Sequence, residues 1–235
     1  MNKPPLVLHV DNLDLNFKQK PWDFAVERAA EIETYFAERQ RQTPALWNGQ
    51  VLLMHRQVLS DGVFRGDFLQ TDFASFSAWR TWGMPKAAVH DCFASAGLVS
   101  ADGAFLLGVM GGHTFNSGRV YFSCGTPDPS DIKDGKVDFA FSVARELKEE
   151  TGLDVSEFAA EPGWTMAVDG ALIGLVKILR SQQSAEDLRA RILKQLASEA
   201  EPELADIRIV RSPADFDARM PDFVKAVMRE HFGRR

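Results

Sequence analysis

Three glutamates near the middle of the chain have a spacing that suits the binding of a divalent metal ion. Glu146, Glu149 and Glu150 fall at positions i, i+3 and i+4 of the segment 138–153, DFAFSVARELKEETGL. In a helix this spacing brings their carboxylates onto adjacent turns, where they repel one another unless a cation lies between them. Mg²⁺ or Mn²⁺ prefers such oxygen ligands and leaves positions open for water and for phosphate oxygens. The segment therefore predicts metal-dependent chemistry on a phosphorylated substrate.

The same segment has a second interpretation as an ordinary helix. Arg145 lies four residues before Glu149 and could orient that carboxylate through a charge-assisted hydrogen bond. A stretch of Arg, Glu and Lys is also typical of a solvated helix face that carries no chemistry. Composition alone favours the solvated helix, whereas the order of the residues favours a functional site.

The order of residues 145–153, Arg-Glu-Leu-Lys-Glu-Glu-Thr-Gly-Leu, resembles the second half of the Nudix hydrolase signature at all nine positions. The resemblance implies an enzyme that cleaves the pyrophosphate bond of a nucleoside diphosphate linked to another moiety, with Mg²⁺ or Mn²⁺ as cofactor. It implies Glu146, Glu149 and Glu150 as metal ligands. It also implies Glu149, Glu150 and Arg145 as catalytic residues, and which glutamate acts as base stays open.

The first half of the signature is altered in this chain. Gly125 and Asp131 keep the glycine-to-acid spacing with aspartate in place of glutamate, but thirteen residues then precede Arg145 where the pattern has seven. The additional residues lengthen a segment, 127–136, whose Pro, Asp, Ser and Gly content predicts a surface loop. The acid that replaces the first glutamate is Asp131, Asp134 or none. Because of this alteration, a noncatalytic Nudix-fold module that binds a nucleotide or has a regulatory role remains the alternative function.

Contacts to the substrate are predicted only weakly. The glycine-containing segment 111–118 lies between two expected strands, and a plain connecting loop is its alternative interpretation. His113, Arg119 and Gly125 are the candidates for contact with phosphate. No motif identifies the substrate, so ADP-ribose, sugar nucleotides, dinucleotides and coenzyme A derivatives all remain open.

The composition restricts the partners and the compartment. The chain has 235 residues and a net charge of −6, which argues against a protein that binds the phosphate backbone of nucleic acids. Cys92 and Cys124 are far apart and have no metal-ligand spacing, so we expect two reduced thiols. No apolar run is long enough to span a membrane, and the first residues turn acidic too soon for a secretory signal. We therefore expect a cytoplasmic protein with a small nucleotide-type substrate and no nucleic-acid or membrane partner.

The elements around the glutamates predict an α/β fold. Ala140, Val143, Ala144 and Leu147 have the spacing of one buried helical face, and the polar residues are expected on the opposite face. A strand over 119–124 precedes this helix, as the signature requires, and further expected strands and helices flank the pair. They cover residues 88–100, 104–110, 163–168, 171–179, 185–198, 207–210 and 221–232. Gly152 is expected to end the central helix in a left-handed conformation, with Leu153 folding back, and Ser184 is expected to cap the helix at 185–198.

The resemblance implies a Nudix-like α/β/α sandwich with a mixed sheet over residues 87–235. The first part of the chain, 1–86, is predicted to form an accessory α+β lobe with a strand at 6–10, a helix at 22–40, a hairpin at 50–70 and a short helix that is capped by Thr71 or Asp72 and ends at Trp82. Two roles are open for this lobe. It packs on the catalytic domain, or it mediates formation of a homodimer.

Overall fold

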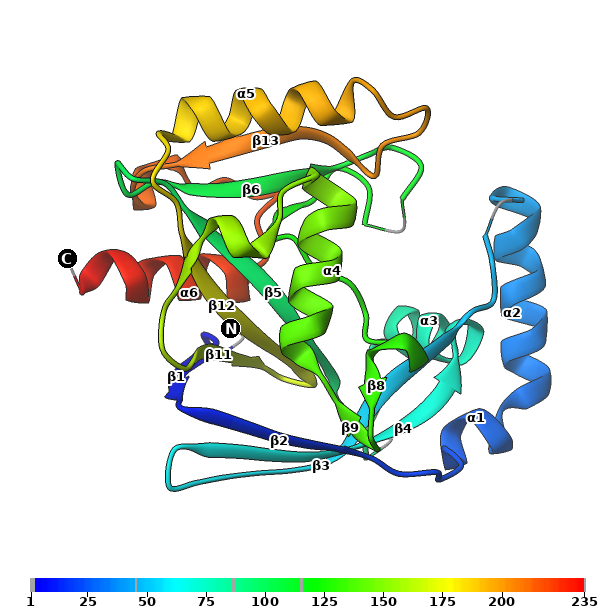
Figure 1. Cartoon of the computed structure of the whole chain (residues 1–235). Coiled ribbons are helices and arrows are strands. Elements are labelled where there is room, and N and C mark those ends of the chain that lie inside the picture. The colour runs from blue at the N-terminus through cyan, green and yellow to red at the C-terminus, as the bar shows by residue number, and fades with distance from the viewer. Residues whose placement is uncertain (1–2, 45, 86–87, 115, 235) are drawn as a thin grey trace. The chain divides into compact units, whose positions relative to one another are not determined.

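The computed structural model describes residues 3–44, 46–85, 88–114 and 116–234, and their elements fall into two compact units (Figure 1). Unit 1 consists of Met1–Asn12, Phe93–Gly125 and Phe139–Arg235, and unit 2 consists of Leu13–Cys92 and Thr126–Asp138. Each unit is therefore assembled from separate segments of the chain. The expected boundary between residues 86 and 87 falls on two residues outside the described ranges, and it stays a prediction.

Unit 1 contains a sheet in which β1, β11, β12, β5, β6 and β13 follow one another. Two short strands extend it, because β7 pairs with β6 and β10 pairs with β12. The strands are β1 (Leu6–Val10), β5 (Asp91–Val99), β6 (Phe105–Met110), β7 (Val120–Tyr121), β10 (Ala159–Ala160), β11 (Trp164–Asp169), β12 (Leu172–Arg180) and β13 (Leu204–Val210). Every residue of β5 is buried, as expected for a strand inside a sheet that is covered on both faces.

The α-helices among the described residues of unit 1 are α4 (Phe139–Thr151), α5 (Ala185–Leu196) and α6 (Asp222–Gly233). Helix α4 ends as its sequence predicts, because Gly152 adopts a positive φ of 71° and Leu153 folds back to become buried. Ser184 accepts a hydrogen bond from the backbone N–H of Asp187 and so caps α5, which confirms the expected cap.

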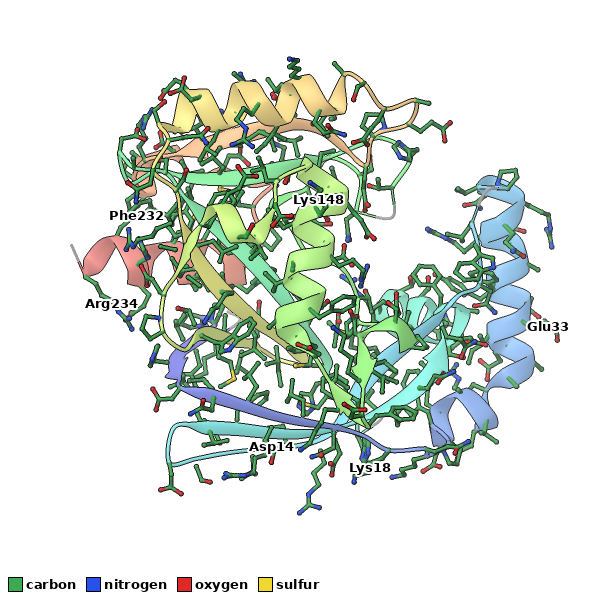
Figure 2. The ribbon with its side chains drawn as sticks, viewed as in Figure 1. Asp14, Lys18, Glu33, Lys148, Phe232 and Arg234 are labelled. Carbon is green, nitrogen blue, oxygen red and sulfur yellow. The ribbon has the colours of Figure 1, made fainter. Side chains whose placement is uncertain are left out.

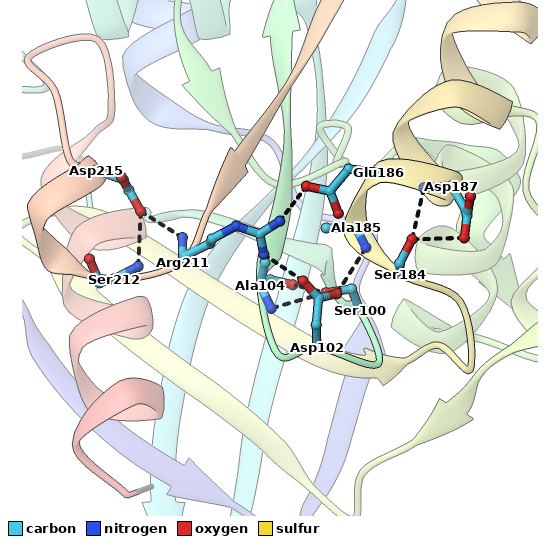
Figure 3. Close-up of polar contacts among 10 residues, drawn as sticks. All are labelled: Ser100, Asp102, Ala104, Ser184, Ala185, Glu186, Asp187, Arg211, Ser212 and Asp215. Atoms are coloured by element: carbon cyan, nitrogen blue, oxygen red, sulfur yellow. Dashed lines mark hydrogen bonds and ion pairs between the residues drawn. The ribbon is translucent and has the colours of Figure 1, made fainter.

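A polar network ties the start of α5 to the turn between β5 and β6 and to the end of β13 (Figure 3). The carboxylate of Asp102 accepts a hydrogen bond from the backbone N–H of Ala185 at 2.9 Å and pairs with Arg211. Arg211 also pairs with Glu186 in the first turn of α5. In the turn between β5 and β6, Ser100 Oγ accepts a hydrogen bond from the backbone N–H of Ala104 at 3.0 Å. These contacts fix α5 beside the sheet that carries the candidate site.

Unit 2 contains a second sheet, in the order β3, β4, β2, β9 and β8. Its strands are β2 (Asn12–Phe17), β3 (Gln50–Ser60), β4 (Val63–Asp72), β8 (Ile132–Lys133) and β9 (Lys136–Val137), and its helices are α1 (Asp23–Glu27), α2 (Ala29–Gln42) and α3 (Phe73–Thr81). The hairpin of β3 and β4 is confirmed, and Asp72 caps α3 by accepting a hydrogen bond from the Ser75 N–H at 2.8 Å. The expected helix at 22–40 is interrupted at Arg28, which separates α1 from α2.

The segment expected as a surface loop at 127–136 instead contains regular structure. A 3₁₀ helix covers Pro129–Asp131, and β8 and β9 form a hairpin that joins the sheet of unit 2 where Lys136 pairs with Asn16. Asp134 and Gly135 at its tip have φ values of 50° and 74°, the left-handed conformations that a tight two-residue hairpin turn requires. The turn residues were recognisable in the sequence, but pairing with a strand more than a hundred residues upstream was not.

The fold is mixed α/β, which confirms the expected class. Figure 2 shows the side chains carried by these elements. Among the residues that the structure describes, none of the helices has the length and apolar character needed to cross a membrane.

Candidate active site

The buried face of α4 includes two of the three predicted metal-binding glutamates. Glu146 is 8% exposed and Glu150 is 3% exposed, and both continue the stripe formed by Val143 and Leu147. The sequence predicted that the polar residues would take the opposite face, and this was wrong for these two. Ala140, which was expected on the buried face, is exposed. An ordinary solvated helix face does not account for the burial of Glu146 and Glu150.

Arg145 lies between the buried and the exposed carboxylates. Its Nη1 atom is 2.8 Å from Glu146 Oε1 and 3.1 Å from Glu149 Oε2. The Glu149 side chain is 60% exposed, whereas that of Glu146 is 11% exposed. The contact predicted between Arg145 and Glu149 is therefore present, and Arg145 also offsets the charge of the more buried Glu146.

Glu150 lies in an environment that disfavours its charged form. Ser123 Oγ donates a hydrogen bond to Glu150 Oε2 at 2.6 Å, while Oε1 is buried and has no hydrogen-bond partner among the described residues. Desolvation raises the pKa of Glu150 well above its ordinary value, and the charges of Glu203 and Glu146 raise it further. Hydrogen bonds from Ser123 and from the backbone of Cys124 act in the opposite direction. An unsatisfied buried carboxylate oxygen is costly, and it indicates a place for a ligand.

Gly125 lies directly against the Glu146 carboxylate. A Cβ atom placed on Gly125 would collide with Glu146 Oε1 and would lie 2.8 Å from Oε2. The residue at this position must therefore be glycine if Glu146 is to keep its place. The weak contact of Gly125 with phosphate stays a prediction, and the structure adds that Gly125 lies against a predicted metal ligand.

A fourth carboxylate, Glu203, was missed by the sequence analysis. Its backbone oxygen accepts a hydrogen bond from the Gly111 N–H at 2.8 Å, which holds the segment before β13 beside the end of β6. Desolvation and the charge of Glu149 raise the pKa of Glu203, whereas His113 lowers it. His113 thus lies near the acidic group, as part of the segment 111–118, in which residue 115 is outside the described residues. The run Glu-Pro-Glu around Glu203 resembles any solvated acidic loop, so no local signal identified it.

The remaining predicted residues are Arg119, Asp131 and Asp134. Arg119 is exposed, and its side chain forms no ion pair with the α4 carboxylates within the described part of the chain. Asp131 and Asp134 belong to unit 2. The Asp131 carboxylate is fully buried and accepts a hydrogen bond from the Asp128 N–H at 3.0 Å, closing the cap of the 3₁₀ helix, and Asp134 is exposed in the hairpin turn.

The carboxylate oxygens of the three glutamates are the type of donor that a hard cation binds. Their present arrangement, however, is not that of a metal site. Glu146, Glu149 and Glu150 supply only oxygen ligands, which Mg²⁺ and Mn²⁺ prefer, and Oε1 of Glu150 is available. Within the described residues, however, no three His, Cys, Asp or Glu side chains are already gathered as a metal site. Arg145 occupies the space between two of the carboxylates, so a bound ion requires these side chains to rearrange.

Comparisons with known proteins give similarities of fold. No protein-family model matches the chain, and no curated protein matches it. A Nudix hydrolase from M. smegmatis, RenU, is 14% identical over 62% of this chain and 85% of that chain, with a TM-score of 0.39. The MutT protein from Methanosarcina mazei Go1 is 17% identical over 60% of this chain and 95% of that chain, with a TM-score of 0.38.

A third similar structure is a bifunctional NMN adenylyltransferase/ADP ribose pyrophosphatase from Francisella tularensis, complexed with AMP and a Mn ion. It is 13% identical over 68% of this chain and 46% of that chain, with a TM-score of 0.41. At identities this low, the comparisons concern the fold alone and not the activity. The first of these structures is named as a Nudix hydrolase, the family whose signature residues 145–153 of this chain resemble.

Proposed function

We propose that this chain is a metal-dependent hydrolase that cleaves the pyrophosphate bond of a nucleoside diphosphate linked to another moiety. The observation that supports this most directly is the burial of Glu146 and Glu150 on α4, next to the exposed Glu149. Burying carboxylates is costly unless protons, opposite charges or a metal compensate them. The burial of two acids is not expected in a helix whose polar residues only face solvent. It is expected where carboxylates bind a divalent ion.

In this proposal Glu146, Glu149 and Glu150 hold Mg²⁺ or Mn²⁺. When bound, the ion would neutralise the diphosphate and lower the pKa of an attacking water. Arg145 keeps Glu146 and Glu149 from repelling each other and orients both carboxylates. Either Glu149 or Glu150 takes the proton of the attacking water, since both lie on the turn that carries the ligands.

The test separates metal binding from turnover. Mn²⁺ binding is measured by calorimetry on the whole chain, and hydrolysis is screened with ADP-ribose, sugar nucleotides, dinucleotides and coenzyme A derivatives. We expect Glu150→Gln to reduce hydrolysis by at least about 100-fold, in the range found when an essential acid or base is removed. Glu201→Gln, at an exposed acid of the same unit, serves as the matched control. Undiminished hydrolysis by Glu150→Gln would show that the assignment is wrong.

Comparison of Glu149→Gln with Glu150→Gln distinguishes a ligand from a base. Loss of a ligand weakens Mn²⁺ binding, whereas loss of the base lowers kcat and leaves the Mn²⁺ affinity close to that of the unaltered chain. The exposed Glu149 and the buried Glu150 differ enough in environment for the two variants to differ in this respect.

A noncatalytic nucleotide-binding module is the second candidate. It is favoured by the ion pairs that Arg145 makes with Glu146 and Glu149, which already offset their charge, and by the use of Asp131 as a helix cap in unit 2. This candidate predicts that nucleotides bind without Mn²⁺ and are not cleaved. The calorimetric titration with Mn²⁺ therefore distinguishes the two functions.

A further inference from the structure

Ser123 is held rigidly beside the candidate site. Ser123 is buried, with 6% of its surface exposed, and it precedes the segment 127–136 in the sequence. Its backbone oxygen accepts a hydrogen bond from the Ala96 N–H at 2.9 Å, and the two residues form an isolated antiparallel bridge. Because Ala96 is part of the fully buried strand β5, the backbone of Ser123 has little freedom to move.

The hydroxyl group of Ser123 selects one oxygen of Glu150. Ser123 Oγ lies 2.6 Å from Glu150 Oε2 and 3.4 Å from the backbone oxygen of Glu146. A hydroxyl group carries a single hydrogen, and the short contact to a carboxylate is the stronger of the two. The hydrogen is therefore donated to Oε2, and Oε1 remains without a partner among the described residues.

We propose that Ser123 is a positioning residue, which holds Glu150 by Oε2 so that Oε1 is presented to a divalent cation. This inference rests on the proposed function, because it assigns to Ser123 the orientation of one proposed metal ligand. Groups that hydrogen-bond to metal ligands fix their direction, and their loss typically weakens metal binding by about 10- to 100-fold. The Cys124 backbone also donates to Glu150, so part of the orientation survives without the hydroxyl group.

The chain offers a closely matched control in Ser95. This serine precedes Ala96 on β5, is fully buried, and has an Oγ atom with no hydrogen-bond partner among the described residues. Ser123→Ala and Ser95→Ala therefore remove the same atom from neighbouring buried positions, and only the first removes a contact with Glu150. Ser123→Thr retains the hydroxyl group, and Ser123→Cys retains the side-chain volume but replaces the hydroxyl group with a weak donor.

The experiment is a calorimetric titration of each whole chain with Mn²⁺, accompanied by circular dichroism to verify folding. We expect Ser123→Ala to weaken Mn²⁺ binding by about tenfold, at the lower end of the range for such partners because the Cys124 backbone remains. We expect Ser95→Ala to bind as the unaltered chain does, and Ser123→Thr to bind more tightly than Ser123→Ala. If Ser123→Ala does not fold, the isosteric Ser123→Cys decides, with the same weakening expected.

Three results would overturn the inference, and they are distinguishable from one another. If the unaltered chain binds Mn²⁺ and Ser123→Ala or Ser123→Cys binds it equally well, the positioning role is wrong and the proposed function stands. If the unaltered chain binds no Mn²⁺, the proposed metal site and the role of Ser123 are both wrong. Equal weakening in Ser95→Ala and Ser123→Ala would assign the effect to packing, which also contradicts the inference.

Discussion

At the scale of single residues, the candidate site depends on close approaches between groups from different elements. Gly125 leaves room for the Glu146 carboxylate, and Ser123 donates to Glu150. These contacts explain how two acids are accommodated on the buried face of α4. They also give predictions in which the removal or addition of one atom has a defined effect.

The first prediction concerns Gly125→Ala. The added methyl group would collide with the Glu146 carboxylate, which is the movable end of a side chain, so the carboxylate should swing away while the fold is kept. We expect Mn²⁺ affinity and hydrolysis to fall by about tenfold or more, the effect of misplacing a metal ligand. Gly112→Ala is the control, because a Cβ there meets nothing within 4 Å. Equal activity of the two variants would contradict the role assigned to Gly125.

The second prediction concerns the pH dependence that Glu150 confers. Burial raises its pKa above the ordinary 4.5, so the folded chain favours the protonated form. The folded state is therefore destabilised as pH rises above about 4.5, because the unfolded chain then releases a proton that the folded chain retains. Glu150→Gln removes this penalty and should unfold at higher urea concentration than the unaltered chain at pH 8, with a gain of about 1.4 kcal/mol for each unit of pKa shift.

At pH 4 the same substitution should give no such gain, since the glutamate is protonated in both states. The measurement is urea unfolding in EDTA, so that no metal compensates the carboxylates. Exposed Glu149→Gln is the control. A gain that does not depend on pH would show that Glu150 does not titrate as its burial indicates.

At the scale of elements, α4 and α5 differ in the contacts that determine their ends and hold them in place. The sequence of α4 determines its end at Gly152, while its acids find their places only against Ser123 and Gly125. The start of α5 is fixed by a side-chain cap and by Asp102 from another element. Removal of Asp102 should therefore loosen α5 without touching the candidate site directly.

The third prediction concerns Asp102→Asn. A hydrogen bond from Ser100, and then those from Arg211 and the Ala185 backbone, lower the pKa of Asp102 to about 2. Because the folded-state pKa is lowered, the charge contributes stability above about pH 4 that is lost as pH falls toward 2. The ion pair is partly exposed, so we expect a loss of about 0.5 to 1 kcal/mol at pH 7.

Thermal unfolding at pH 7 and at pH 2.5 measures this effect. The difference between Asp102→Asn and the unaltered chain should shrink at the lower pH. Glu201→Gln, at an exposed acid outside this network, provides the control. A difference that is as large at pH 2.5 as at pH 7 would show that the charge of Asp102 does not stabilise α5.

At the scale of the whole molecule, the order of segments along the chain differs from their grouping into units. Strand β1, from the start of the chain, pairs with β11 in unit 1, with Leu6 opposite Val168 and Val10 opposite Trp164. The segment Thr126–Asp138 belongs to unit 2 although it lies between two segments of unit 1. The lobe predicted over residues 1–86 therefore contains a strand of the sheet that carries the site.

The fourth prediction concerns removal of β1. Deletion of residues 1–11 would leave the backbone groups of β11 at an open sheet edge and expose apolar surface to water. We expect a lower midpoint of thermal unfolding by several degrees and increased binding of an apolar dye. Deletion of residues 1–5 alone, which ends before β1, is the control. An unchanged midpoint after the longer deletion would show that β1 does not stabilise unit 1.

The sequence by itself determined the features that depend on neighbouring residues. A cap of α3 at Thr71 or Asp72, the hairpin of β3 and β4, the left-handed Gly152 and the Ser184 cap of α5 were all predicted, because each depends on contacts within a few residues. The order of residues 145–153 likewise gave the family resemblance and the three glutamates. All of these follow from local chemistry.

Only the tertiary structure decided which of those glutamates are buried and what they contact. Helical spacing alone does not determine which face of α4 packs against the sheet. Glu146 and Glu150 were therefore expected on the solvent-exposed face with the other polar residues. Ser123 and Glu203 lie 27 residues before and 53 residues after Glu150 in the sequence, and no local pattern connects them to it. Burial and long-range contacts arise from packing between segments that are distant in the sequence, so patterns among neighbouring residues do not predict them.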